Sequence, residues 1–374
     1  MNDRIQTNGA TKPIRVLIVD DSAFMRKALS LMLESDPGIR VVGTACDGLE
    51  GVEKVNRLKP DLVTMDIEMP RMDGLAALRE IMLHHPTPVM MISSLTTDGA
   101  TATLEALDMG AVDFIPKGKS YVSLDIVQIR DSLIEKIKDI VCRKSLLMAR
   151  FRRLGLPRLQ AGRSATPTAL TGAAARPSRF VAKRIHPISI IVVGSSTGGP
   201  PALQAIIPRL PRNLPVGMVV AQHMPAAFTK SLAERLDSLS QVSVKEAADG
   251  DLIEPGTVLI APGGRHLTVR RAGARTHAVI SDEPSDTLYK PCVDVTAKSV
   301  AEAFGPAALG VILTGMGSNG LAGMGLVREK GGIVVAEAEE SCVVYGMPRA
   351  VIEAKLAHHI ATIENVASEI MAYF

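Results

Sequence analysis

The segment RVLIVDDSAFMRKALSLMLES (residues 15–35) decides the fold, because it joins an apolar run, a pair of aspartates and an amphipathic stretch. A short run such as VLIV is typical of a buried strand. In the stretch that follows, apolar side chains recur at helical spacing and form one face. They are Phe24, Met25, Ala28, Leu29, Met32 and Leu33. The segment therefore predicts a strand that ends at Asp20 and Asp21, followed by a helix.

The same alternation of strand and helix continues along the chain. Four further apolar runs precede Asp139, near residues 41–42, 61–66, 89–93 and 111–115. Together they predict a five-stranded parallel sheet covered by helices on both sides. The rhythm returns at Ile188, although residues 242–282 contain short alternating segments that predict antiparallel hairpins. The predicted fold class is α/β, with two doubly wound parallel-sheet domains and a hairpin insertion in the second.

The composition favours two folded domains and shows an uneven distribution of charge along the chain. The chain has 374 residues, 47% of them hydrophobic, which favours two folded domains. Aromatic residues make up only 3%, with no Trp, which argues against a stacking platform for single-stranded nucleic acid. The net charge of +3 conceals eleven Lys or Arg within 143–184 and no Asp or Glu between 140 and 233. Outside residues 143–184, acidic residues exceed basic ones.

Residues 140–186 are rich in Ala, Gly, Pro, Ser and Thr without sustained periodicity, which predicts a basic flexible linker. It would connect a first domain at 14–139 with a second at 187–374. We favour a solvated spacer as its role, with attraction to an acidic surface as the alternative.

The cysteines and the N-terminal residues predict the compartment. Four scattered cysteines form no C-x-x-C pair and are expected to be buried thiols in a reducing compartment. They are Cys46, Cys142, Cys292 and Cys342. The polar N-terminal residues lack a hydrophobic signal core. We therefore expect a cytoplasmic protein without membrane insertion.

Charged side chains follow several strands of the first predicted sheet. Asp20 and Asp21 end the first strand and Asp66 ends the third, so the three carboxylates are expected to meet in one crevice. They would repel one another without a cation, and Mg²⁺ suits such ligands. With the Ser93 hydroxyl and the Lys117 ammonium, the group suits a carboxylate that accepts a phosphoryl group. The alternative is that each Asp only caps a helix.

The motifs DD, MDIEMPRMDG, SS and PKG, in this order, resemble the receiver domain of two-component response regulators over about residues 14–139. The resemblance implies a histidine kinase as phosphodonor and Asp66 as the phospho-acceptor. It also implies a Mg²⁺ site and two phosphoryl contacts. The metal ligands would be Asp20, Asp21, Asp66 and the backbone carbonyl of Glu68, and the phosphoryl contacts Ser93 and Lys117.

A second group of polar residues lies in the other domain. Residues 194–198, GSSTG, fit G-x-S-x-G between a strand and a helix, as a nucleophile turn requires. A phosphate cradle at a helix N-terminus is the alternative, although the Gly-Lys-Ser/Thr ending of a nucleotide loop is absent. His223 ends the next strand and TGMGSNG (314–320) follows another. His223 could then remove the Ser196 proton while backbone N–H groups receive the oxyanion.

GSSTGGP, QHMP, APGGRHL, VDV, TGMGSNG and YGMPRA, in this order, resemble the catalytic domain of the protein-glutamate methylesterases of bacterial chemotaxis, the CheB family. The resemblance implies hydrolysis of glutamyl methyl esters on the cytoplasmic helices of chemoreceptors, and in some members deamidation of receptor glutamines. No cofactor is implied for the ester hydrolysis. Ser196 would be the nucleophile, His223 the base, and Thr197 and Met316 neighbours of the oxyanion-binding turns.

One position departs from that family. Asn319 stands where the motif normally has Asp, and an amide can orient an imidazole but cannot stabilise imidazolium by charge. Three interpretations follow: a slow esterase, an enzyme rescued by another carboxylate such as Asp294, or a receptor-binding scaffold under receiver control. We expect retained but attenuated esterase activity, since nucleophile and base are present. DNA binding is not expected, because no helix-turn-helix pattern follows the receiver.

Overall fold

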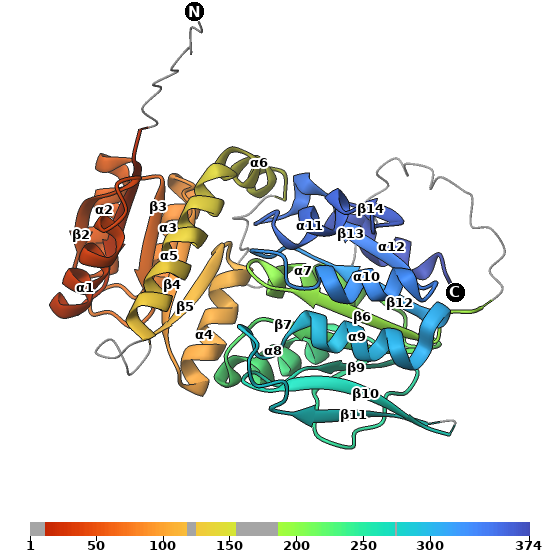
Figure 1. Ribbon diagram of the computed structural model, residues 1–374. Helices are drawn as coiled ribbons and strands as arrows, with labels where there is room; N and C mark the ends of the chain where they lie inside the picture. The colour runs from red at the N-terminus through yellow and green to blue at the C-terminus, as the bar shows by residue number, and fades with distance from the viewer. Residues whose placement is uncertain (1–11, 118–124, 155–185, 274) are drawn as a thin grey trace, which may run out of the picture. The chain divides into compact units, whose positions relative to one another are not determined.

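The computed structural model describes residues 12–117, 125–154, 186–273 and 275–374 (Figure 1). Most of the predicted linker and six of its basic residues lie outside these ranges. The chain divides into two compact units, Met1–Ala149 and Arg150–Phe374.

The first unit confirms the predicted five-stranded parallel sheet. Its strands run in the order β2-β1-β3-β4-β5, and the chain reverses its direction of progress between β1 and β3. Ligands of such sheets bind beyond the carboxyl ends of the strands at this switch point. The strands are β1 (Ile14–Val19), β2 (Ile39–Ala45), β3 (Leu62–Asp66), β4 (Val89–Ser94) and β5 (Asp113–Lys117). The helices are α1 (Ala23–Glu34), α2 (Gly48–Leu58), α3 (Gly74–His84), α4 (Thr97–Asp108), α5 (Asp125–Cys142) and α6 (Lys144–Leu154), the last of which crosses the division between the units.

Local sequence explains where these elements begin. A polar side chain precedes each of the first four helices and accepts a backbone N–H of the first turn, which satisfies a donor that the helix itself cannot. These N-caps are Ser22, Asp47, Asp73 and Thr96. The inner strands β1, β3 and β4 are buried along almost all their length, as expected for strands covered on both faces, whereas the edge strands β2 and β5 are partly exposed. Within the described ranges, no helix has the length and apolar character needed to span a bilayer.

The second unit contains a seven-stranded parallel sheet in the order β14-β13-β12-β6-β7-β9-β8. Its switch point lies between β12 and β6, which are neighbours although far apart in the chain. The strands of this sheet are β6 (Ile190–Ser195), β7 (Gly217–Gln222), β8 (Ser243–Glu246), β9 (Thr257–Ile260), β12 (Ala308–Ile312), β13 (Ile333–Glu337) and β14 (His359–Ala361). The helices are α7 (Gly199–Ile206), α8 (Ala226–Leu239), α9 (Val293–Phe304), α10 (Leu321–Glu329), α11 (Met347–Glu353) and α12 (Ile363–Met371). In the described part of this unit, the 3₁₀ helices are η1 (Ile207–Arg209), η2 (Gly305–Ala307) and η3 (Glu339–Ser341).

The hairpin insertion is confirmed but is shorter than predicted. Among the strands that the structure describes, only β10 (His266–Ala272) and β11 (Arg275–Ser281) pair antiparallel with each other, whereas β8 and β9 join the parallel sheet. Strand β9 is buried along almost all its length, and the hairpin strands become exposed towards their turn. Burial on both faces therefore distinguishes the parallel strand β9 from the hairpin strands β10 and β11. The short alternating sequence pattern did not predict this burial.

The predicted start of the linker is wrong. Helix α5 continues to Cys142, and α6 covers Lys144–Leu154, so the first part of the segment from residue 140 is helical. Ile140, Leu147 and Met148 recur at helical spacing and are buried, and Lys144 forms an ion pair with Asp61 at 3.0 Å. The basic composition obscured this apolar face.

The expectation of four buried thiols is also wrong. Cys292 and Cys342 are buried, but Cys46 and Cys142 are exposed. The exposed cysteines lie at the ends of elements, directly after β2 and at the last residue of α5, where packing is least complete.

Candidate active site

The first unit brings the predicted acidic residues together at the switch point between β1 and β3. Oxygen atoms of Asp20, Asp21 and Asp66 all lie within 4.8 Å of one another. Asp20 and Asp66 are buried, and Asp21 is exposed. The cluster therefore has the charge, the ligand type and the solvent access that a hard divalent cation requires.

Lys117 supplies part of the balancing charge. Its Nζ lies 2.6 Å from Asp66 Oδ2 and 3.2 Å from Asp20 Oδ2. Burial raises the pKa of the Asp66 carboxyl to about 6, although the Lys117 ammonium acts to lower it. Among the described residues, the buried Asp20 Oδ2 atom receives no well-aligned hydrogen bond. One ammonium thus leaves the three carboxylates incompletely satisfied, and the residues fit a divalent cation.

Two predicted residues of this site have other contacts in the structure. The buried Ser93 hydroxyl donates to the backbone carbonyl of Gly99 at 3.1 Å, in the first turn of α4. Glu68 is exposed, and its side chain accepts a hydrogen bond from Ser94 at 3.4 Å. The roles of Ser93 in phosphoryl contact and of the Glu68 carbonyl in metal binding stay predictions.

In the second unit, Ser196 directly follows β6 in a tight turn. Its N–H donates to the carbonyl of Thr314, and its own carbonyl accepts from Gly199, the first residue of α7. Gly198 turns the chain with a φ of 75°, a conformation that glycine adopts without steric cost. Ser196 is half-buried between buried neighbours, so its hydroxyl keeps access to solvent.

His223 follows β7, the neighbour of β6, and approaches the serine. Its Nδ1 lies 3.2 Å from Ser196 Oγ, and its Nε2 lies 2.9 Å from Asn319 Oδ1. The ring of Tyr289 stacks on the imidazole with centroids 4.2 Å apart and planes at 14°. Hydrogen bonding at both nitrogens and stacking on one face orient the imidazole.

The loop of residues 314–320 supplies Asn319 and lies against the nucleophile turn. A Cβ built on Gly315 would be 2.8 Å from Ser196 Cβ, so only glycine permits this approach. Within the described chain, the backbone N–H groups of Thr197 and Met316 donate to no protein acceptor. Both remain available to a developing oxyanion.

Two residues with contacts in the site were not singled out from the sequence. Gln222, the last residue of β7, is buried and bonds the backbone carbonyls of Ser196 and His223. A polar residue inside an otherwise apolar strand, beside His223, was the available signal. Tyr289 lies in an irregular loop, and no local pattern indicated that it would stack on His223.

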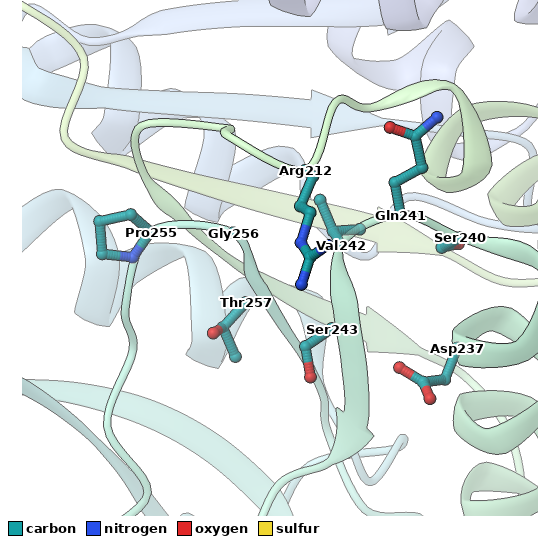
Figure 2. A pocket seen from close by; sticks show the side chains of 9 residues that line it. All are labelled: Arg212, Asp237, Ser240, Gln241, Val242, Ser243, Pro255, Gly256 and Thr257. Carbon is teal, nitrogen blue, oxygen red and sulfur yellow. The ribbon is translucent and has the colours of Figure 1, made fainter.

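A cavity of about 690 Å³ in the same unit lies elsewhere (Figure 2). Its lining includes Ser243 and Thr257, the first residues of β8 and β9, together with Arg212 and Asp237. The reacting groups follow the carboxyl ends of strands, whereas this cavity lies at amino-terminal ends. It is therefore not part of the active site.

Comparison with known proteins covers both units. Residues 16–125 match the response regulator receiver domain, and residues 191–370 match the CheB methylesterase. The protein-glutamate methylesterase/protein-glutamine glutaminase 1 of Oleidesulfovibrio alaskensis is 50% identical over 370 residues, 96% of this chain and 98% of that protein. Protein 2 of the same description from Nitratidesulfovibrio vulgaris is 50% identical over 372 residues, with the same coverage. The corresponding protein of Symbiobacterium thermophilum is 47% identical over 370 residues, 99% of this chain and 98% of that protein.

Fold, sites and comparisons together define a response regulator with an enzymatic α/β output domain. The chain belongs to the CheB methylesterase family. Both resemblances found in the sequence are thereby confirmed.

Proposed function

We propose that the chain is a phosphorylation-activated protein-glutamate methylesterase that hydrolyses glutamyl methyl esters on the cytoplasmic helices of chemoreceptors. The observation that carries the proposal is the 3.2 Å approach of Ser196 Oγ to His223 Nδ1 in a CheB methylesterase domain. The names of its relatives support a second activity, deamidation of receptor glutamines, which proceeds by the same acyl chemistry. With nucleophile, base and orienting amide in hydrogen-bond contact, no described feature favours a scaffold without turnover.

The reaction uses side chains and backbone groups of the second domain. His223 Nδ1 accepts the Ser196 proton as Oγ attacks the ester carbonyl, and the N–H groups of Thr197 and Met316 bind the oxyanion. The imidazolium then protonates the departing methanol, and His223 activates water to hydrolyse the acyl-serine. We expect no cofactor in these steps.

The first domain controls access to this chemistry. A histidine kinase donates a phosphoryl group to Asp66, and Lys117 and Ser93 contact its oxygens. Asp20, Asp21, Asp66 and the Glu68 carbonyl would hold Mg²⁺, which neutralises charge around the phosphoryl group. Phosphorylation then makes Ser196 accessible to the receptor. With these two partners, we expect the protein to act in the cytoplasm.

Methanol release from methylated receptor, with and without acetyl phosphate and Mg²⁺, tests the proposal. We expect stimulation in the parent, no stimulation in Asp66→Asn, and a loss of at least about 10³-fold in Ser196→Ala. Ser318→Ala, which removes an exposed hydroxyl, is the matched control and should behave as the parent. Parent-like release from Ser196→Ala would show that the nucleophile is wrongly assigned. Phosphorylation-dependent receptor binding without methanol release would support the scaffold instead.

A further inference from the structure

The amide of Asn319 is held at both ends. Its Oδ1 lies 2.9 Å from His223 Nε2 and accepts the backbone N–H of Val293 at 2.8 Å. Its Nδ2 donates to Asp294 Oδ2 at 2.9 Å and to Cys292 Sγ at 3.1 Å. The backbone N–H of Val293 requires an acceptor at one end of the amide, and the Asp294 carboxylate requires a donor at the other end. The two requirements agree only when the amide oxygen faces His223.

This orientation decides which nitrogen of His223 carries the proton. An oxygen at Nε2 requires that Nε2 be protonated, and the lone pair then lies on Nδ1, which faces Ser196 Oγ. A reversed amide would instead present N–H to Nε2 and favour the tautomer with the proton on Nδ1. That tautomer cannot accept the serine proton.

Asp294 is itself firmly placed. It lies in the first turn of α9, where the helix dipole favours a carboxylate. Its Oδ1 accepts the N–H of Gly323 in α10 at 2.7 Å, so each carboxylate oxygen has a donor of its own. The carboxylate is therefore fixed between two helices and faces the amide.

We propose that Asp294 is a positioning residue that acts through Asn319, so that the amide and the carboxylate together replace the single acid expected beside His223. The proposal rests on the proposed esterase function. During attack, the serine proton moves to Nδ1, and Nε2–H remains donated to Asn319. The hydrogen bond from Nδ2 to Asp294 increases electron density on the amide oxygen, which strengthens its bond to imidazolium. The proton then leaves with methanol.

A double-mutant cycle distinguishes this role from simple structural support. Asp294→Ala removes both acceptor oxygens. Asp294→Asn leaves one acceptor oxygen for two donors, the Asn319 amide and the Gly323 N–H. Both should lower kcat by about 10- to 100-fold, the scale of one charge-assisted hydrogen bond, with little change in KM. In an Asn319→Asp background, the same changes should lower kcat by less than about threefold, because a carboxylate presents oxygen at either end.

Asp237→Asn is the matched control. Asp237 also accepts a backbone N–H, from Val244 at 2.8 Å, but it takes no part in the hydrogen bonds that join Asp294, Asn319 and His223. Its variant should therefore keep the parent kcat. If the Asp294 variants lose the same factor in both backgrounds, Asp294 only supports the structure and the proposal fails.

Nitrogen NMR of ¹⁵N-histidine-labelled full chain provides a readout that does not depend on turnover. The His223 signal, assigned by its loss in His223→Gln, should report protonation at Nε2 in the parent and a mixture of tautomers in Asp294→Ala. An unchanged tautomer in folded Asp294→Ala would overturn the proposal. A parent without methanol release but with the expected tautomer shift would contradict only the proposed function.

Discussion

Replacing Gln222 with alanine tests whether one buried amide joins the turns that carry the nucleophile and the base. Gln222 is 1% exposed. Its Nε2 donates to the carbonyl of Ser196 at 2.9 Å and to the carbonyl of His223 at 3.0 Å. Its Oε1 accepts the hydroxyl of Ser195 at 2.6 Å. The variant therefore removes three hydrogen bonds and leaves their partners without the amide.

The expected loss of stability is large. Three lost hydrogen bonds at about 1 kcal/mol each, together with the space left by the side chain, amount to about 3–5 kcal/mol of unfolding free energy. Gln222→Glu keeps the shape but places a buried, unpaired charge against two carbonyl oxygens, and should cost at least about 3 kcal/mol. Such losses are a substantial fraction of the stability of an ordinary domain.

The assay is urea unfolding of the full chain followed by circular dichroism, since the protein has no Trp to serve as a fluorophore. Methanol release is measured where each variant is folded. We expect kcat to fall about 10-fold or more, because Ser196 and His223 lose their shared anchor. Gln241→Ala, at an exposed glutamine of the same unit, should change stability by no more than about 0.5 kcal/mol. A Gln222→Ala variant that loses less than about 1 kcal/mol and keeps parent kcat would refute the reasoning.

Two further predictions concern charge and packing. Hydrogen bonds from a neighbouring lysine and a backbone N–H lower the pKa of Glu50 from 4.5 to about 2, so its carboxylate stabilises the fold above pH 4.5 and this contribution is lost as pH falls towards 2. Glu50→Gln should lower the free energy of unfolding by about 1–2 kcal/mol at pH 7, after allowance for solvent screening, and by progressively less below pH 4.5. Urea titrations over this pH range measure the difference, and the control Glu53→Gln, at an exposed glutamate, should show little change. Gly315→Ala places a Cβ 2.8 Å from that of Ser196 and should cost about 1–3 kcal/mol with loss of methanol release. Gly325→Ala in α10, where a Cβ would meet nothing closer than 3.7 Å, should be neutral or gain about 0.5–1 kcal/mol, and equal losses at both glycines would contradict the packing argument.

The local sequence pattern predicted most of the positions of the reacting groups. Apolar runs marked the strands, and polar residues directly after them marked Asp20, Asp66, Ser196 and His223, since parallel strands present their carboxyl ends at one edge. The same pattern did not predict the shortest secondary-structure elements. Strand β14 has three residues and helix α11 has seven, and neither length gives a usable period.

By itself, the sequence determined the two α/β domains, the residue types at their strand ends and, through ordered motifs, the family. Only the tertiary structure decided that β12 lies beside β6, which brings Asn319 to His223 and Gly315 to Ser196. It also decided which way the Asn319 amide faces, since Asp294 and Val293 set that orientation. The physical reason is that helix and strand periods are local properties of the chain. Strand order, burial and the direction of an amide depend on packing between segments distant in sequence.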